Sequence, residues 1–331
     1  MASHSNAALF DLMSYARRGP GHRDSVSPTD ILQIARTVGR APEVMVKVLS
    51  RGANGFAAVR KHLDYIGRKG KVDLETDDGQ EREINELLDD WDLDLDEPRP
   101  RSELSATGGR QRPRLIHKVL FSMPGGTPPA KVLMAVQNFC REEFALKHRY
   151  VMALHTDEPH PHVHVVIKAI SEQGERLNIR NATRRQWRTD FARHLRALGV
   201  AANATHRYLR GETTQRKSDG IYRAGLRGVS THMRDRAEVV AKDLAQGKLR
   251  IEPGKAGLIN TRTKVRRAWL AIGDILIREG QPELATHVRK FVDQMAPPLT
   301  EKERLAAKLQ HQVRHLRPTV KQSMSHSQSG R

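Results

Sequence analysis

The feature that most constrains the fold is a regular alternation in the segment HTDEPHPHVHVVIKA, residues 155–169. Successive side chains of a β-strand point to opposite faces, so His160, His162 and His164 would share one face. The other face would then carry apolar side chains suited to a core, namely Val163, Val165 and Ile167. The segment therefore predicts a strand with imidazoles on one face and a buried apolar surface on the other.

The spacing of these histidines favours a metal site. Imidazoles two residues apart on one strand can both reach a single metal ion. The Glu-Pro pair at 158–159 can turn the chain and bring His155 back beside them. A histidine-rich hairpin without a metal is the alternative, but four histidines within ten residues favour ligation.

The charge of the chain indicates its class of partner. It has 57 Lys and Arg against 38 Asp and Glu, which gives a net charge of +19. Such a charge predicts a polyanionic partner, usually nucleic acid. An anionic membrane surface is the rival, but we expect no membrane insertion because no apolar run is long enough to span a bilayer. The N-terminal sequence lacks a secretory pattern, and the single Cys140 fits a reducing compartment, so we expect a cytoplasmic protein.

Strand and helix patterns along the chain predict an α+β fold. Apolar spacing indicates a strand at 44–50, a turn at 51–54, a helix at 55–67 and a strand at 72–76. Further strands are expected at 115–123, 149–155, 160–170 and 176–179, with helices at 130–146 and 184–198. This order predicts an antiparallel sheet covered on one face by helices, whose other face presents the histidines.

Composition divides the chain into four regions. Residues 1–40 are expected to be a loosely attached N-terminal extension, and 41–215 the domain that carries the histidines, with a polar linker at 97–113. The composition and apolar spacing of residues 216–317 predict a basic, mostly helical C-terminal region, with a clear helix at 264–280. Thr300 and Glu303 form a capping box for its final helix. Residues 318–331 are expected to be a disordered tail.

A metal beside a basic surface suggests phosphodiester chemistry, which needs a nucleophile. Tyr65 is one of five tyrosines and lies near the end of the helix expected at 55–67. The basic segment GRKGK (67–71) follows directly and can hold a phosphate. A half-buried helix tyrosine at a core edge is the alternative.

Three segments carry a resemblance to a known family. HLDYIGRKGKVDLETDDG (62–79), HKVLFSMPGGT (117–127) and HTDEPHPHVHVV (155–166) resemble the three ordered motifs of plasmid mobilization relaxases. These enzymes belong to the HUH endonucleases, and the resemblance is greatest to the T-DNA border endonuclease branch. It covers roughly residues 44–215 and implies a ferredoxin-like or RRM-like core.

The resemblance implies roles for individual residues. It places the nucleophile at Tyr65 and a DNA contact at Ser122. It places Asp157 in the catalytic site, beside the first histidine, where a carboxylate can orient an imidazole. His160 falls on a position of variable type and is not assigned to the metal. The implied metal ligands are His155, His162 and His164, although His155 can alternatively serve as general base for the tyrosine.

The implied activity is nicking of one DNA strand at an origin of transfer, by metal-assisted tyrosine transesterification that leaves a 5′-phosphotyrosine adduct. The resemblance implies Mg or Mn as the divalent ion, whereas imidazole ligands leave Zn, Co and Ni open. The implied partners are single-stranded origin DNA, relaxosome accessory proteins and the coupling protein of a secretion channel.

Three other functions compete with this one. A rolling-circle replication initiator shares the histidine pair, but its nucleophile usually follows the histidine motif, whereas Tyr65 precedes it. A DNA-binding protein that has lost catalysis would not need the tyrosine together with the histidines. A metal-dependent hydrolase that uses water would leave no protein–DNA adduct.

Overall fold

The structure is a computed structural model that describes residues 10–17, 19–49, 55–93, 114–213, 219–247 and 249–326. The chain divides into two compact units. Gly39–Ala204 forms the first, here called the sheet unit, and Met1–Val38 with Thr205–Arg331 forms the second, the helical unit. The expected turn at 51–54 and linker at 97–113 lie outside the described residues.

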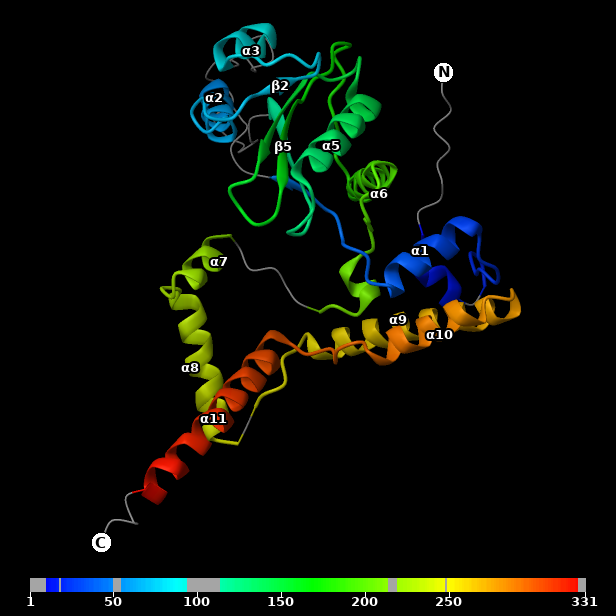
Figure 1. The fold of residues 1–331 in the computed structure, drawn as a ribbon, viewed down its shortest axis with the longest axis vertical. Coiled ribbons are helices and arrows are strands. Elements are labelled where there is room, and N and C mark those ends of the chain that lie inside the picture. Colours follow the sequence, from blue (N-terminus) through cyan, green and yellow to red (C-terminus); the bar gives the residue numbers. More distant parts are fainter. Residues whose placement is uncertain are drawn as a thin grey trace, which may run out of the picture. The chain divides into compact units, whose positions relative to one another are not determined.

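The sheet unit is built on a five-stranded antiparallel sheet with the strand order β1-β3-β5-β4-β2. Figure 1 marks β2 and β5 of this sheet. The strands are β1 (Met45–Leu49), β2 (Glu75–Thr76), β3 (Ile116–Ser122), β4 (Tyr150–His155) and β5 (His162–Lys168). The histidine-bearing strand β5 is central and pairs with both β3 and β4. The predicted α+β class is confirmed.

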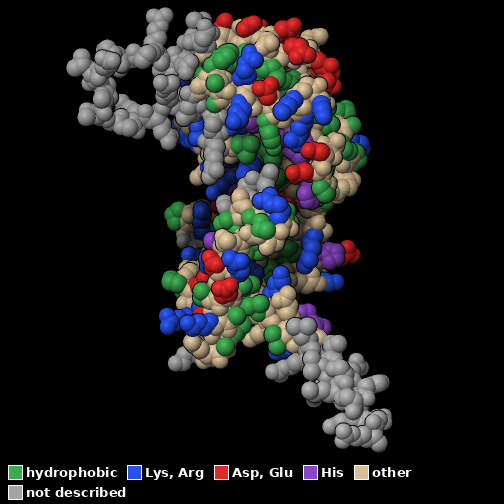
Figure 2. Space-filling model, turned by 90° about the vertical axis from the view of Figure 1, so that its left-hand side faces the viewer, with side chains coloured by type: hydrophobic (Ala, Val, Ile, Leu, Met, Phe, Trp, Pro, Cys, Tyr) green, Lys and Arg blue, Asp and Glu red, His purple; other side chains and the backbone are tan. Residues whose placement is uncertain are grey.

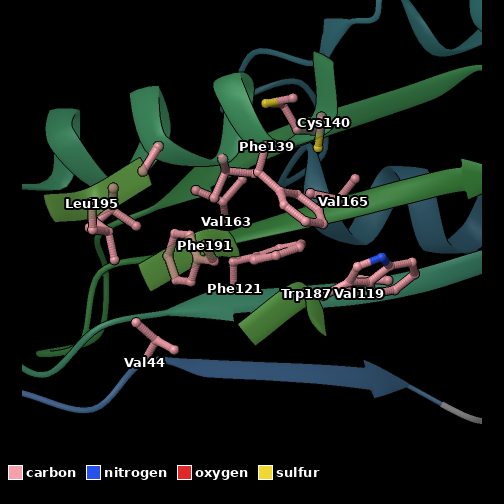
Figure 3. Packing of buried hydrophobic residues seen from close by; sticks show 14 of the residues in the cluster. Val44, Val119, Phe121, Phe139, Cys140, Val163, Val165, Trp187, Phe191 and Leu195 are labelled. Atoms are coloured by element: carbon pink, nitrogen blue, oxygen red, sulfur yellow. The ribbon is translucent and has the colours of Figure 1, made fainter. Parts of the chain in front are cut away.

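One face of the sheet packs against α5 (Pro129–Phe144) and α6 (Asn181–Ala197). Val163, Val165 and Ile167 are buried in this core, as their alternation predicted. Phe121 lies at its centre, with ring centroids 4.9 Å from Phe139 and 5.2 Å from Phe191 (Figure 3). Because β5 is buried on this side, its histidines must lie on the opposite face.

The opposite face is also partly covered, which corrects the expectation of helices on one face only. The helices α2 (Phe56–Ile66) and α3 (Ile84–Asp90) form a second core with strands β3, β4 and β5. In α2, the residues at 59, 63 and 66 form the apolar stripe expected from their spacing, and all three are fully buried. An apolar stripe must be covered, and the sheet provides the apolar partner.

Two predicted strands are shorter than their patterns suggested. The strand expected at 72–76 is reduced to Glu75–Thr76, which pairs with β4 and then enters the turn at Gly79. The segment 176–179 forms no strand beyond a bridge between Arg176 and Ile170, because the chain turns directly into α6. Short peripheral pairings of this kind are weakly marked in sequence.

The described part of the helical unit contains short 3-10 helices and a set of α-helices. They are η1 (Leu12–Ala16), α1 (Pro28–Val38), η3 (Arg207–Arg210), α7 (Asp219–Leu226), α8 (Thr231–Ala245), α9 (Lys255–Arg278), α10 (Pro282–Asp293) and α11 (Glu301–His326). Residues 10–38 are not a loose extension here, because Leu12, Tyr15 and Ile34 are buried in one core with Trp269 of α9. The Trp269 indole N–H donates to the Leu209 carbonyl at 2.8 Å.

The last helix begins as its sequence predicted. The Glu303 backbone N–H donates to Thr300 Oγ1, and the Thr300 N–H donates to the Glu303 carboxylate at 2.8 Å, which completes the capping box. The helix α11 then runs to His326, so residues 318–326 are helical rather than disordered, and 327–331 lie outside the described residues. Among the helices that the structure describes, none is long and apolar enough to cross a membrane.

Candidate metal centre and nucleophile

Three histidines meet on the partly covered face of the sheet. His155 ends β4 and pairs directly with His162 of β5, and His164 lies two residues further along β5. One ring nitrogen of each lies within 4.8 Å of the others, and all three side chains are buried. This arrangement is the expected result of a period-two pattern on one strand and a tight return of its neighbour.

The electrostatic setting favours the neutral form of two of these rings, His155 and His164. Burial, and next the positive forms of His155 and His162, lower the pKa of His164 to about 3. Burial also lowers the pKa of His155, an effect that its hydrogen bond to the Ile66 backbone partly opposes. Neutral imidazole is the form that binds a metal ion. Three ring nitrogens that lie this close together can serve as ligands of one divalent ion. An ion with three protein ligands can also bind substrate.

A hydrogen bond ties the triad to helix α2. The Nε2 atom of His155 lies 2.7 Å from the Ile66 carbonyl, so this nitrogen carries the proton and donates it. Its Nδ1 atom then accepts from Arg68 Nη2 at 3.3 Å. Since Ile66 is the residue after Tyr65, this bond places the end of the tyrosine-bearing helix beside the histidines.

The structure brings Tyr65 to the triad. Its ring lies 5.9 Å from that of His164, edge to face, and 48% of its surface is exposed. Another of the five tyrosines, Tyr15, is 1% exposed in the helical unit, and its hydroxyl donates to the buried Asp30. Only an accessible phenol can reach a phosphate, so the geometry favours Tyr65 over Tyr15.

Arg68 joins three of the candidate residues. Its guanidinium lies 2.6 Å from the Asp157 carboxylate and 5.3 Å from the centre of the Tyr65 ring, besides its bond to His155. Asp157 thus contacts Arg68, and through it the imidazole that we expected it to orient. Arg68 and Lys69 both have a positive φ, 50° and 57°, a conformation that is costly for residues with a Cβ. The segment after the tyrosine is held in a strained turn that places the cation over the site.

The remaining sequence candidates lie around this centre. Ser122 is buried and pairs with His162 across β3 and β5. His160 stays outside the triad, because its Nδ1 accepts from the Gly125 N–H at 3.0 Å and its carbonyl contacts His162 Nδ1. The omission of His160 from the ligand set agrees with this placement.

Sequence reasoning missed His62. Its ring stacks on Tyr65 with centroids 6.0 Å apart and lies 6.4 Å from His164. Its Nε2 atom is buried without a hydrogen-bond partner among the described residues, and burial lowers its pKa to about 4. The signal was available, because residues three apart on a helix share a face.

Part of the sheet unit matches a known protein family. Residues 66–199 match the family described as "Relaxase: MobA/VirD2-like, nuclease domain". The match includes the three histidines and begins one residue after Tyr65.

Similar curated proteins agree with it. The chain is 26% identical over 208 residues to the T-DNA border endonuclease VirD2 of Agrobacterium fabrum, which is 56% of this chain and 44% of that protein. It is 28% identical over 142 residues to VirD2 of Rhizobium rhizogenes, covering 39% and 31% of the two chains. These matches span less than half of the length of the relatives. Together with the sheet and its histidines, they show that the sheet unit contains a relaxase nuclease domain of the MobA/VirD2-like family.

Proposed function

We propose that the chain nicks one strand of DNA at an origin of transfer and remains attached to the 5′ end through Tyr65. The observation that carries the proposal is the position of the exposed Tyr65 phenol beside the buried triad, 5.9 Å from the His164 ring. A nucleophile next to side chains that can hold a Lewis-acid metal ion suits the transfer of a phosphoryl group. The relatedness to T-DNA border endonucleases supports the same substrate class.

The reaction exchanges one phosphodiester for another. The Tyr65 oxygen attacks phosphorus, its bond to phosphorus forms as the bond to the DNA 3′ oxygen breaks, and the 3′-hydroxyl leaves with a proton. The phenol proton passes to a base. Because one phosphodiester replaces another, the step is close to thermoneutral, and the released 3′-hydroxyl can reverse it.

The three histidines and Arg68 have separate parts in this reaction. A divalent ion held by His155, His162 and His164 would supply a Lewis acid at the scissile phosphate, with Mg or Mn proposed first and Zn, Co or Ni compatible with the ligands. Arg68 holds a positive charge over the Tyr65 ring, where the phosphate must enter. Because His155 Nε2 donates its proton to the Ile66 carbonyl, this residue would hold the ion through Nδ1, the nitrogen that faces Arg68.

The proposed partners follow from the same chemistry. Single-stranded DNA is the substrate, and we propose relaxosome accessory proteins and a secretion-channel coupling protein as partners of the full assembly. Basic side chains are spread over the visible surface rather than gathered in one band, which suits a polyanion that contacts the protein at many points (Figure 2).

The test captures the covalent adduct from a pool of random DNA sequences, so it does not depend on the choice of origin. A randomised single strand labelled at its 3′ end is incubated with the full chain and Mn or Mg, and covalent products are separated on a denaturing gel and sequenced. We expect a labelled adduct that is absent in Tyr65→Phe and strongly reduced in His162→Ala. Tyr208→Phe is the matched control, since Tyr208 is also exposed and also stacks on a histidine. Nicked DNA without adduct would indicate hydrolysis, and an adduct in Tyr65→Phe would assign another nucleophile.

A further inference from the structure

A cavity with a positively charged lining lies in the sheet unit, away from the triad. The cavity, of about 610 Å³, is lined by Arg114, Arg176, Arg184 and His117, with Val48 and Ile179 among its apolar walls. It opens beside the start of β3 and the segment that leads into α6.

The sheet register separates this cavity from the candidate metal centre. His117 pairs with Ile167, whereas Ser122, five residues further along β3, pairs with His162. Five residues of strand span about 17 Å. His117 also shares a face with Val119 and Phe121, which are buried under α5 and α6. The cavity and the triad therefore lie toward opposite ends and on opposite faces of the same sheet.

The three arginines of the cavity have no carboxylate partner among the described residues. Arg176 Nη1 donates to the Arg114 carbonyl at 2.8 Å, and Arg184 donates to the side chain of Asn181, and both of these acceptors are neutral. Arg193, in the same helix as Arg184, instead pairs with Glu142 at 2.6 Å. Like charges gathered without a counterion repel each other, so this cluster is suited to an anionic ligand.

His117 and the apolar walls restrict the chemical class of ligand that fits the cavity. Its Nδ1 atom is buried and has no hydrogen-bond partner among the described residues. Burial, and next the charge of Arg114, lower the pKa of His117 to about 4, so the ring is neutral at physiological pH. A neutral ring can accept a hydrogen bond from an N–H group. Phosphate oxygens, an N–H donor and an apolar face occur together in a nucleotide.

We propose that this cavity binds a nucleotide segment of the DNA strand at a distance from the scissile phosphate. The phosphates would contact Arg114, Arg176 and Arg184, and a base would lie against Val48 and Ile179 near His117. Because β1 is an edge strand, a single strand can pass from Ser122 around β1 to reach the cavity. The identity of the ligand as DNA rests on the proposed function, and the cavity would then set how much DNA the protein holds during the reaction.

Binding without cleavage tests this proposal separately from the nicking reaction. The full chain in EDTA is titrated against a fluorescent mixed-sequence DNA strand of roughly 30 nucleotides, long enough for several sites. The double variant Arg114→Gln/Arg184→Gln is compared with Arg193→Gln, the matched control on α6. We expect the double variant to bind about tenfold more weakly. The slope of the logarithm of its binding constant against the logarithm of the salt concentration should become shallower by about 1.4, or about 0.7 for each lost phosphate contact.

Other results would overturn the proposal. Equal affinity and equal salt dependence in the double variant and the control would show that the cavity does not hold DNA. Binding of polyglutamate that depends on Arg114 and Arg184 and resists competition by the DNA strand would identify an acidic protein segment as the ligand instead. Thermal melting of each variant shows whether it is folded, and ultraviolet crosslinking of a bromouracil-substituted strand to the peptide 176–184 gives a readout in the unmutated protein. A chain that forms no adduct would still give these results, so the two proposals can fail independently.

Discussion

The buried His164 of the triad makes the metal-free protein sensitive to acid. His164 is 6% exposed, and its pKa is lowered to about 3 in the folded state. In the unfolded chain its pKa returns to about 6.5. Above that pH the ring is neutral in both states and stability does not change. As the pH falls below about 6.5, His164 binds a proton in the unfolded chain but not in the folded chain, so folding becomes less favourable.

The size of the effect follows from proton linkage. Each pH unit between the two pKa values costs about 1.4 kcal/mol for one histidine, so lowering the pH from 6.5 to 5 removes about 2 kcal/mol of stability. We expect His164→Phe to abolish this part of the pH dependence, because phenylalanine does not titrate. Metal bound by the triad should oppose the loss in the unmutated protein, because it binds the folded state only.

The assay must report on the sheet unit alone. Trp91 and Trp187 are buried in that unit and Trp269 in the helical unit, so a Trp269→Phe background restricts the fluorescence change to the first two. Urea unfolding is then measured in EDTA at pH 7 and pH 5, with and without His164→Phe. If the two proteins lose the same free energy of unfolding between these pH values, His164 is not the group that resists protonation, and the reasoning fails.

Three further outcomes are expected. Phe121→Ala should lower the unfolding free energy of the sheet unit by about 3–5 kcal/mol in urea, because Phe121 is fully buried among aromatic rings, and a loss below 1 kcal/mol would contradict the packing. Arg68→Met should slow adduct formation about tenfold or more while changing stability by less than about 1 kcal/mol, since the ion pair with Asp157 is largely exposed; unchanged kinetics would show that Arg68 has no role in the site. Added Mn should raise the urea midpoint of the unmutated chain but not that of His162→Ala, and an equal rise in both would place the metal elsewhere.

Patterns carried by single elements could be predicted from sequence. The alternation on β5 fixes both of its faces, and the apolar stripe of α2 fixes the helix and its buried side. The stripe does not say which surface it packs against, so the coverage of the second sheet face was not foreseen. Contacts between elements were likewise not predictable at the site. The histidines were visible as a motif, but the contacts of Arg68 with Asp157 and His155 depend on a strained turn. The shared face of His62 and Tyr65 was visible in principle and overlooked.

The ends of the sheet unit are joined to each other. The Val44 N–H donates to the Asn203 carbonyl, and the Asn203 N–H donates to the Pro42 carbonyl at 2.8 Å. The sheet unit is thus an insertion within the helical unit, whose α1 precedes it and whose α9 and α10 follow it. During synthesis, the sheet unit can fold once residue 204 has emerged, whereas α1 gains its packing partners only after α10 is complete. The order of assembly is therefore set by chain topology, with the sheet unit first.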